Sequence, residues 1–221
     1  MTIPGRALII VAEQGDFMMK QISFAKGKWN REDFILAFPF RLRDTSAFIQ
    51  EEDCVSGGAN PEHSEGFDNF SLLTRETYGP GVRACTHSMF EKRGCTEIIF
   101  VPEISRGESG EKRYGACFEI VIYKGGVNVW RHYYDEGKCS WHKRLGMEFP
   151  LDENEAHTLA AEVQPHYLVF TLDGKKTILR TDDFPERFHL GITCCEGAAR
   201  IYDLSIETGV PSTVPVEGGL E

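Results

Sequence analysis

Long hydrophobic runs and an excess of basic residues are both missing from this sequence. The apolar stretch ALIIVA at 7–12 is too short for a signal-peptide core or a membrane span, so we interpret 1–12 as a first strand. The 24 lysine and arginine residues are outnumbered by 34 aspartate and glutamate residues, giving a formal net charge of -10. Nucleic acids and anionic membranes require a basic face. We therefore expect neither as a partner; a neutral ligand fits better.

The sequence also lacks any Cys-x-x-Cys pair. Its seven cysteines form an odd set, without the regular spacing of a disulfide framework or the tight ligand spacing of a zinc site. We expect buried free thiols that pack as small hydrophobic groups, no bound metal, and a location in the reducing cytoplasm. The cysteines are Cys54, Cys85, Cys95, Cys117, Cys139, Cys194 and Cys195.

Amphipathic helix patterns are scarce, whereas short runs rich in β-branched and aromatic residues recur between glycine, aspartate and proline. This pattern is typical of an all-β sandwich or barrel. At 221 residues the chain suits one such domain, which we place at 1–208, followed by a flexible tail at 209–221. Strands are expected at 33–43, 69–75, 81–90, 97–102, 114–123, 127–134, 158–163, 167–172, 176–180, 188–194 and 199–207.

Proline and glycine refine this outline in three places. Pro39 predicts that 33–43 is an edge or bulged strand, because proline cannot donate to a sheet ladder. The stretch 50–67 contains adjacent glycines and Pro61, and we expect a long loop there. The stretch 106–112 is expected to form an exposed turn.

Two hairpins are indicated by their turn residues. Asp173-Gly174 is a strong signal for a type I′ turn, in which both central residues take positive φ. Gly125-Gly126 marks the second hairpin. A two-residue turn there would place Glu119 opposite His132, whereas a three-residue turn would swap the faces of the second strand relative to the first.

The last third of the chain resembles the closing strands of concanavalin A-like, laminin-G-like and galectin-like jelly rolls. The resemblance covers HTLAAEV (157–163), YLVFTLDG (167–174), FHLGI (188–192) and IYDLSI (201–206). It implies a two-sheet antiparallel jelly-roll β-sandwich. These residues build the sandwich rather than a ligand site, so the resemblance indicates fold and not activity.

The functional motifs of those families are not found. Retaining glucanases of this fold carry Glu-x-Asp-x-x-Glu on one strand, which places carboxylates on one face at the separation that double displacement needs. Here the acidic runs 51–53 and 152–155 lie in turn-like contexts. The segment NVWRH at 128–132 contains residue types of the galectin motif in the wrong order, so no galactoside preference follows.

One face of the glycine hairpin has the composition of a sugar-binding surface. Sugar C–H groups stack on aromatic rings, while hydroxyls exchange hydrogen bonds with short polar side chains. Alternatively, Trp130 and Tyr134 belong to the core, and Glu119 with His132 forms a solvated cross-strand pair. The face comprises Glu119, Val121, Tyr123, Asn128, Trp130, His132 and Tyr134.

Three further residues are candidates for the same site. Trp141 follows a predicted turn and could line the rim of the groove. Arg83 and His87 occupy alternate positions of one predicted strand and could join the same concave sheet, unless they are ordinary structural polar residues. No Asp-x-Asp-x-Asp-Gly series is present, so the structural calcium of several such jelly rolls has weak support and no cofactor is expected.

Three functions remain open at this stage. The first is a lectin-like protein that holds a neutral or weakly charged glycan through Glu119, Asn128, Trp130 and His132. The second is a glycoside hydrolase or polysaccharide lyase that uses Glu119 or His132 as proton donor or base. The third is a scaffold without catalysis, whose exposed sheet pairs two copies into a homodimer.

Overall fold

The computed structural model describes residues 9–10, 18–41, 48–57, 69–91, 93–195 and 198–212. Within these residues the chain forms strands and one short 3-10 helix, η1 (Arg31–Asp33). This confirms the all-β prediction. In the same part of the chain, no helix has the length and apolar character to cross a membrane.

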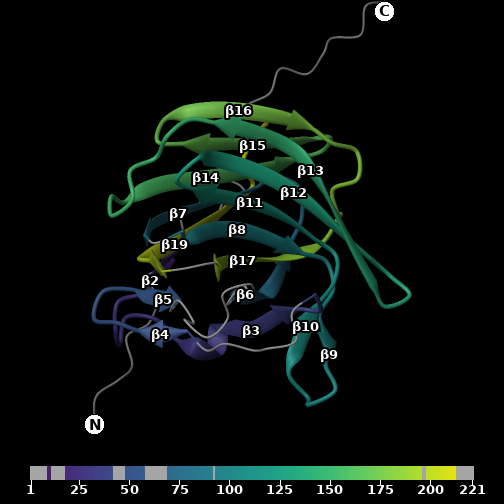
Figure 1. Cartoon of the computed structure of the whole chain (residues 1–221), viewed down its shortest axis with the longest axis horizontal. Coiled ribbons are helices and arrows are strands. Elements are labelled where there is room, and N and C mark those ends of the chain that lie inside the picture. The colour runs from purple at the N-terminus through teal and green to yellow at the C-terminus, as the bar shows by residue number, and fades with distance from the viewer. Residues whose placement is uncertain are drawn as a thin grey trace, which may run out of the picture.

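The strands form two sheets, which run across the molecule in roughly the same direction (Figure 1). The first sheet has ten strands, of which seven follow the order β1-β2-β19-β7-β14-β15-β16, while β18, β5 and β4 branch beside β7. Its strands are β1 (Ile9–Ile10), β2 (Met18–Ser23), β4 (Ile49–Gln50), β5 (Val55–Gly57), β7 (Val82–Glu91), β14 (His157–Gln164), β15 (Tyr167–Leu172), β16 (Lys175–Arg180), β18 (Ala198–Ile201) and β19 (Asp203–Thr208).

The second sheet has nine strands in the order β13-β12-β11-β8-β17-β6-β3-β10-β9. Neighbouring strands in it are antiparallel except β3 and β10, which run parallel. Its strands are β3 (Phe34–Pro39), β6 (Asn69–Tyr78), β8 (Cys95–Val101), β9 (Ser105–Arg106), β10 (Lys112–Tyr114), β11 (Cys117–Tyr123), β12 (Gly126–Asp135), β13 (Lys138–Glu148) and β17 (Phe188–Cys195).

The main core lies between the two sheets. Side chains of a strand alternate between its faces, so every second residue of a strand enters this core. Phenylalanine dominates it, and burial of each ring contributes about 1.5–3 kcal/mol. The core phenylalanines with at most 1% exposure are Phe24, Phe70, Phe90, Phe100, Phe118, Phe170 and Phe188.

The hairpin between β15 and β16 turns as its sequence predicts. Asp173 has φ 46° and Gly174 has φ 81°, the positive values that a type I′ turn requires. The Asp173 carboxylate also accepts hydrogen bonds from Thr158 N at 2.8 Å and from His157 Nδ1 at 2.7 Å. The turn residue therefore fastens the hairpin to the neighbouring strand β14.

Replacing Asp173 with alanine is expected to destabilise the protein by about 1–2 kcal/mol, because both hydrogen bonds to the carboxylate are lost. Asp173→Asn keeps an oxygen acceptor and tolerates positive φ, so it is expected to cost less. Asp173→Gly separates the loss of these hydrogen bonds from backbone strain, since glycine tolerates the positive φ but cannot form the bonds. Urea unfolding of the three variants measures the differences, and equal midpoints for alanine and asparagine would contradict the role of the carboxylate.

Two segments differ from the expectations. The strand β3 is interior, between β6 and β10, so the prediction of an edge strand is wrong; Pro39 is accommodated as its last residue. The predicted loop 50–67 contains β5, which pairs with β18, while 58–67 lies outside the described residues.

The strands β2 and β13 were not expected, and the first residues after 208 make hydrogen bonds to the ten-stranded sheet. After β19 ends at Thr208, Val210 N donates to Gly81 O at 2.9 Å, and its carbonyl accepts from Gln164 Nε2 at 3.1 Å. These bonds hold the segment 209–212 against the ten-stranded sheet. The rest of the predicted tail lies outside the described residues.

Candidate functional site

The nine-stranded sheet has an outer face, turned away from the main core, that we call the site face. In β11 and β12, Phe118, Ile120, Ile122, Val127 and Val129 belong to the main core. The alternate residues therefore lie on the site face. They are Cys117, Glu119, Val121, Tyr123, Asn128, Trp130, His132 and Tyr134.

The predicted faces are right although the predicted pairing is shifted by two residues. Glu119 pairs with Trp130, and His132 pairs with Cys117, because the two-residue turn is Lys124-Gly125 rather than Gly125-Gly126. A shift of two keeps every side chain on its face. Gly126 has φ 131°, and a Cβ there would collide with the Met147 carbonyl, which explains why glycine begins β12.

A buried, hydrogen-bonded pair replaces the solvated pair considered from the sequence. His132 Nε2 donates to Glu119 Oε1 at 2.6 Å, and both residues are only 4% exposed. Burial by itself raises the pKa of Glu119, but the hydrogen bond and charge of His132 outweigh it and lower the pKa below its usual value. Glu119 is therefore an ionised carboxylate held inside the sheet face.

A second buried carboxyl group, Glu97, lies on the neighbouring strand β8. Its register partner is Val121, two residues along β11 from Glu119, so both carboxyl groups lie on the site face. Burial and the negative charge of Glu119 raise the pKa of Glu97 to about 8. Glu97 Oε1 accepts from Cys195 Sγ at 2.8 Å, whereas the buried Oε2 has no hydrogen-bond partner among the described residues. At neutral pH one carboxyl group is thus protonated and the other ionised.

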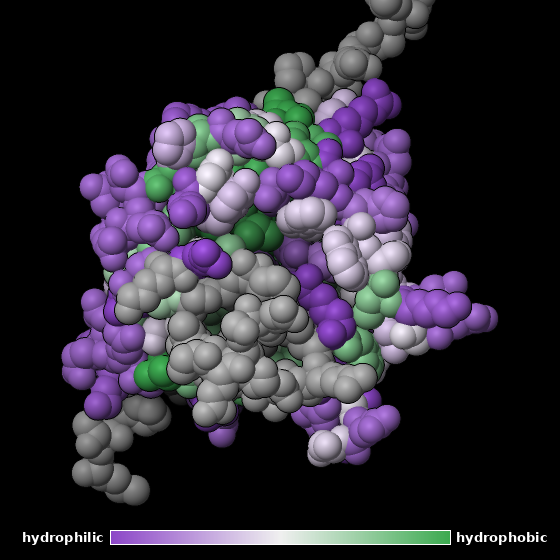
Figure 2. All heavy atoms as spheres, in the orientation of Figure 1, coloured by the Kyte–Doolittle hydropathy of each residue, from purple (hydrophilic) through white to green (hydrophobic). Residues whose placement is uncertain are grey.

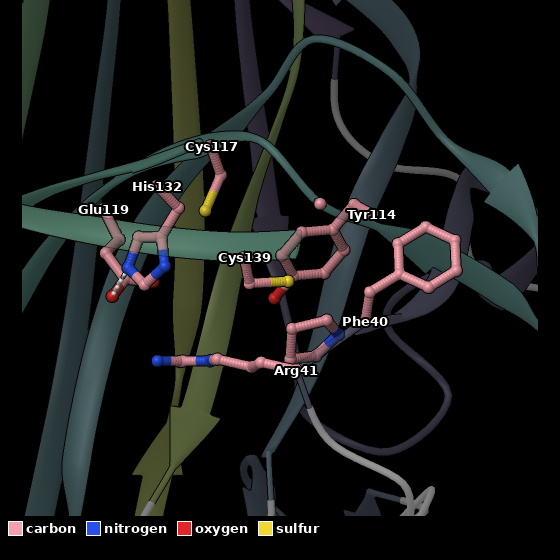
Figure 3. Close-up of a pocket in the computed structure, with 9 residues that line it drawn as sticks. Phe40, Arg41, Tyr114, Cys117, Glu119, His132 and Cys139 are labelled. Carbon is pink, nitrogen blue, oxygen red and sulfur yellow. Dashed lines mark hydrogen bonds and ion pairs between the residues drawn. The ribbon is translucent and has the colours of Figure 1, made fainter. Parts of the chain in front are cut away.

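Arg41 brings a positive charge to these two carboxyl groups. Figure 3 shows its extended side chain with the guanidinium on the side of Glu119 and His132. Burial lowers the pKa of Arg41, but the charges of Glu119 and Glu97 outweigh this effect and raise it. A cavity of about 10 Å³ lies here, room for about one water molecule. Its lining consists of Pro39, Phe40, Arg41, Tyr114, Gly115, Cys117, Glu119, His132 and Cys139.

Aromatic side chains surround the buried polar groups. Trp141 of β13 is paired with His132 and is 54% exposed, with the two rings 6.3 Å apart and nearly parallel. Tyr134 is 39% exposed and stacks on Phe40 at 4.7 Å. Trp130 is half-buried, with Lys143 Nζ 5.4 Å from its ring centroid. These three aromatic residues therefore lie outside the main core, and Trp141 and Tyr134 offer ring surface to solvent.

One group of side chains on this face has the donor types of a metal site. Cys117, Glu119 and His132 offer a sulfur, an oxygen and a nitrogen, all within 4.8 Å of one another. The positive charge of Arg41 beside Glu119 opposes a cation at this position. A second group, Glu51, Asp53 and Cys54, is partly exposed, and Glu51 already has Arg200 as its partner at 3.4 Å.

Arg83 and His87 do not belong to this site. Both lie on β7 of the ten-stranded sheet, so the prediction that they share the concave sheet with Trp130 is wrong. Each has its own partner: Arg83 pairs with Glu207 at 3.7 Å, and His87 Nδ1 donates to Asp203 at 2.8 Å. Alternation along a strand gives the face of a residue, but not the sheet to which the strand belongs.

Sequence reasoning missed Glu97, Arg41 and Cys117. Cys117 and Glu119 alternate on one strand, a spacing that does signal a shared face. Glu97 stands in the run TEIIF, where its neighbours suggest a buried strand on both faces, and nothing local indicates that β8 adjoins β11. Arg41 lies two residues after β3 ends at Pro39, and only the fold brings it to Glu119.

Comparisons with known proteins give likeness in structure only. No protein-family model matches the chain, and no curated protein matches it in sequence. The solved structure of β-agarase A in complex with oligoagarose is similar with a TM-score of 0.61 and 8% identity, over 90% of this chain and 96% of that one. The carbohydrate-binding module CBM66 from Bacillus subtilis has a TM-score of 0.55 and 11% identity, over 74% and 92% of the two chains.

A third similar structure is the κ-carrageenase from Pseudoalteromonas carrageenovora, in complex with an oligotetrasaccharide of κ-carrageenan. Its TM-score is 0.54 and its identity 10%, over 90% of this chain and 97% of that one. These likenesses extend over most of both molecules. The chain therefore has the concanavalin A-like jelly-roll fold, a two-sheet β-sandwich shared by carbohydrate-binding modules and glycanases.

Proposed function

We propose that the protein binds a glycan on the site face, along β12 and β13. The observation that carries this proposal is the exposed Trp141 ring beside the His132–Glu119 pair, with Tyr134 two residues beyond His132 on the same face of β12. Exposed rings stack against the C–H faces of sugars, and nearby polar groups orient the hydroxyls.

The rest of the described surface supports a local site rather than a broad hydrophobic interface. Figure 2 shows hydrophilic residues over most of the face that is coloured, with small hydrophobic patches between them. Of the exposed large hydrophobic residues, Tyr134 and Trp141 lie on neighbouring strands of the site face, whereas the other three belong to the ten-stranded sheet. All five are Met18, Ile49, Tyr134, Trp141 and Ile178.

Replacing Trp141 with alanine is expected to weaken glycan binding at least about tenfold, or about 1.4 kcal/mol, because the stacking surface is lost. The measurement is a panel of neutral and acidic oligosaccharides, read by tryptophan fluorescence and calorimetry. Ile178→Ala is the matched control, since Ile178 is 44% exposed on β16 of the other sheet. Equal affinities for Trp141→Ala and the wild type would contradict a site on this face. If the wild type bound none of the oligosaccharides, a scaffold without glycan binding would be favoured.

A second candidate function is a glycan-active enzyme, and the Glu97–Glu119 pair is the observation that favours it. Two carboxyl groups with pKa values driven apart supply an acid and a base at one pH: Glu97 would donate a proton, while Glu119 would act as base or nucleophile. Since both groups are buried, the side chains around them would have to move to admit a sugar.

Product analysis on the same panel distinguishes the two functions. New reducing or unsaturated ends made by the wild type and lost in Glu97→Gln would establish catalysis. Binding without any product would leave the lectin-like function, and Glu97→Gln would then bind like the wild type.

A further inference from the structure

Two of the seven cysteines lie opposite each other on neighbouring strands of the nine-stranded sheet. Cys95 of β8 and Cys195 of β17 are register partners in an antiparallel pair. Both lie on the site face, both are 7% exposed, and together with Val121 they form a small cluster against which Trp130 and Tyr123 pack. Neither thiol is bound in a disulfide.

The register brings the two residues within reach of a disulfide bond. Opposite residues of antiparallel strands have Cα atoms about 4.5–5.5 Å apart, inside the range of about 4.4–6.8 Å found in disulfides. Cβ atoms of such pairs are about 4.5–5.5 Å apart, so bridging requires them to approach by up to about 1 Å. The nearness of the two thiols also has an electrostatic effect, since Cys95 raises the pKa of Cys195.

The other five cysteines have no such partner in the sheets. Cys85 lies opposite Ala160 and Ser205, Cys117 opposite His132, and Cys139 opposite Tyr134. Cys194, next to Cys195 in sequence, points into the main core and lies opposite Thr96 and Phe70. Cys54 lies outside the strands, directly before β5. Among the described strands, Cys95 and Cys195 are therefore the only two cysteines that are register partners.

We propose that Cys95 and Cys195 are a redox modification site, which a small two-electron oxidant converts into a cross-strand disulfide beneath Trp130. Both S–H bonds break and one S–S bond forms, while two electrons and two protons pass to the oxidant. With diamide as the oxidant, the azo N=N group takes them up and becomes a hydrazine. The reaction is reversed by a dithiol, which returns the electrons and protons.

The modification reaches the candidate site in two ways. It removes the thiol hydrogen that Cys195 donates to Glu97 Oε1, leaving this buried carboxyl group without that donor. It also pulls β8 and β17 together under Trp130, which packs on the same cluster. The inference stands on the sheet register and does not depend on whether a glycan is bound.

The test treats the folded wild-type protein with diamide and maps its peptides without reduction. We expect a loss of two free thiols per chain and one disulfide-linked peptide pair, containing Cys95 and the Cys194-Cys195 sequence. Cys195→Ser should abolish this pair, whereas the matched variant Cys194→Ala should retain it, because Cys194 faces the core.

Tryptophan fluorescence supplies a second readout. Oxidation should change the emission of the wild type and of Cys194→Ala, the change should reverse with dithiothreitol, and it should be absent in Cys195→Ser and reduced in Trp130→Phe. A disulfide that joins any other cysteines, or retention of all seven thiols in folded protein while the urea-unfolded chain oxidises, would overturn the proposal.

Discussion

Glu97→Gln is expected to stabilise the protein at pH 8–9 and to leave its stability at pH 4–5 nearly unchanged. The carboxyl group of Glu97 has a pKa of about 8 in the folded chain, against an ordinary value of 4.5. The folded state thus binds a proton more tightly than the unfolded state, and its stability falls as pH rises between these values. The stabilisation that Glu97 provides through its bound proton is fully present below pH 4.5 and is lost as pH rises through about 8.

The cause is the cost of ionising a carboxyl group that is 2% exposed and lies near the negative charge of Glu119. Glutamine has nearly the same shape and never ionises, so it does not incur this cost. The expected gain at pH 9 relative to pH 5 is of the order of a few kcal/mol.

Urea unfolding at half-unit steps from pH 4.5 to 9 measures the effect. Glu103→Gln, at an exposed position, is the control and should reproduce the wild-type curve. If the stability of Glu97→Gln followed the wild-type curve over the whole pH range, Glu97 would not be a buried protonated acid. Its proposed role as a proton donor would then be contradicted as well.

His132→Ala is expected to destabilise the protein by about 3–5 kcal/mol, because it leaves the buried Glu119 carboxylate without its hydrogen-bonded partner. His132 is the donor to Glu119 Oε1 at 2.6 Å, and the carboxylate is 4% exposed. Without the imidazole, Glu119 loses the largest of the interactions that offset its desolvation.

A second substitution separates this electrostatic loss from the loss of packing. In the His132→Ala background, Glu119→Gln removes the uncompensated charge, so the double variant is expected to be more stable than His132→Ala alone. His142→Ala, an exposed neighbour on β13, is the control and should change stability little. If the changes in unfolding free energy for Glu119→Gln and His132→Ala simply added in the double variant, the two residues would not be coupled as their hydrogen bond indicates.

The wild type should also show the opposite pH response at the acid end, because the folded pKa of Glu119 is lowered. Stability from this group is present above its ordinary value of 4.5 and is lost as pH falls through the folded pKa. Above that value Glu97 makes stability fall as pH rises, and below it Glu119 makes stability fall as pH falls.

The strand β13, next to the site, was not predicted from the sequence, and its side-chain alternation shows why. Trp141 and Lys143 face the site side, whereas Leu145 and Met147 pack on the core, although all four have odd numbers. A bulge against Val129 and Trp130 reverses the alternation, with Arg144 as the additional residue. A pattern of period two is broken at that point, and local sequence does not show that the break is a bulge rather than the end of a strand.

The sequence by itself determined the all-β class, the jelly-roll resemblance, the type I′ turn at Asp173-Gly174, and the face on which Glu119, Trp130 and His132 lie. These follow from local chemistry and from alternation, which survives a pairing shift of two residues. Only the tertiary structure decided which strands become neighbours. It placed Arg83 and His87 on the other sheet and brought Glu97, Arg41 and the Cys95–Cys195 pair to the site, because long-range strand order depends on how both sheets close over one core.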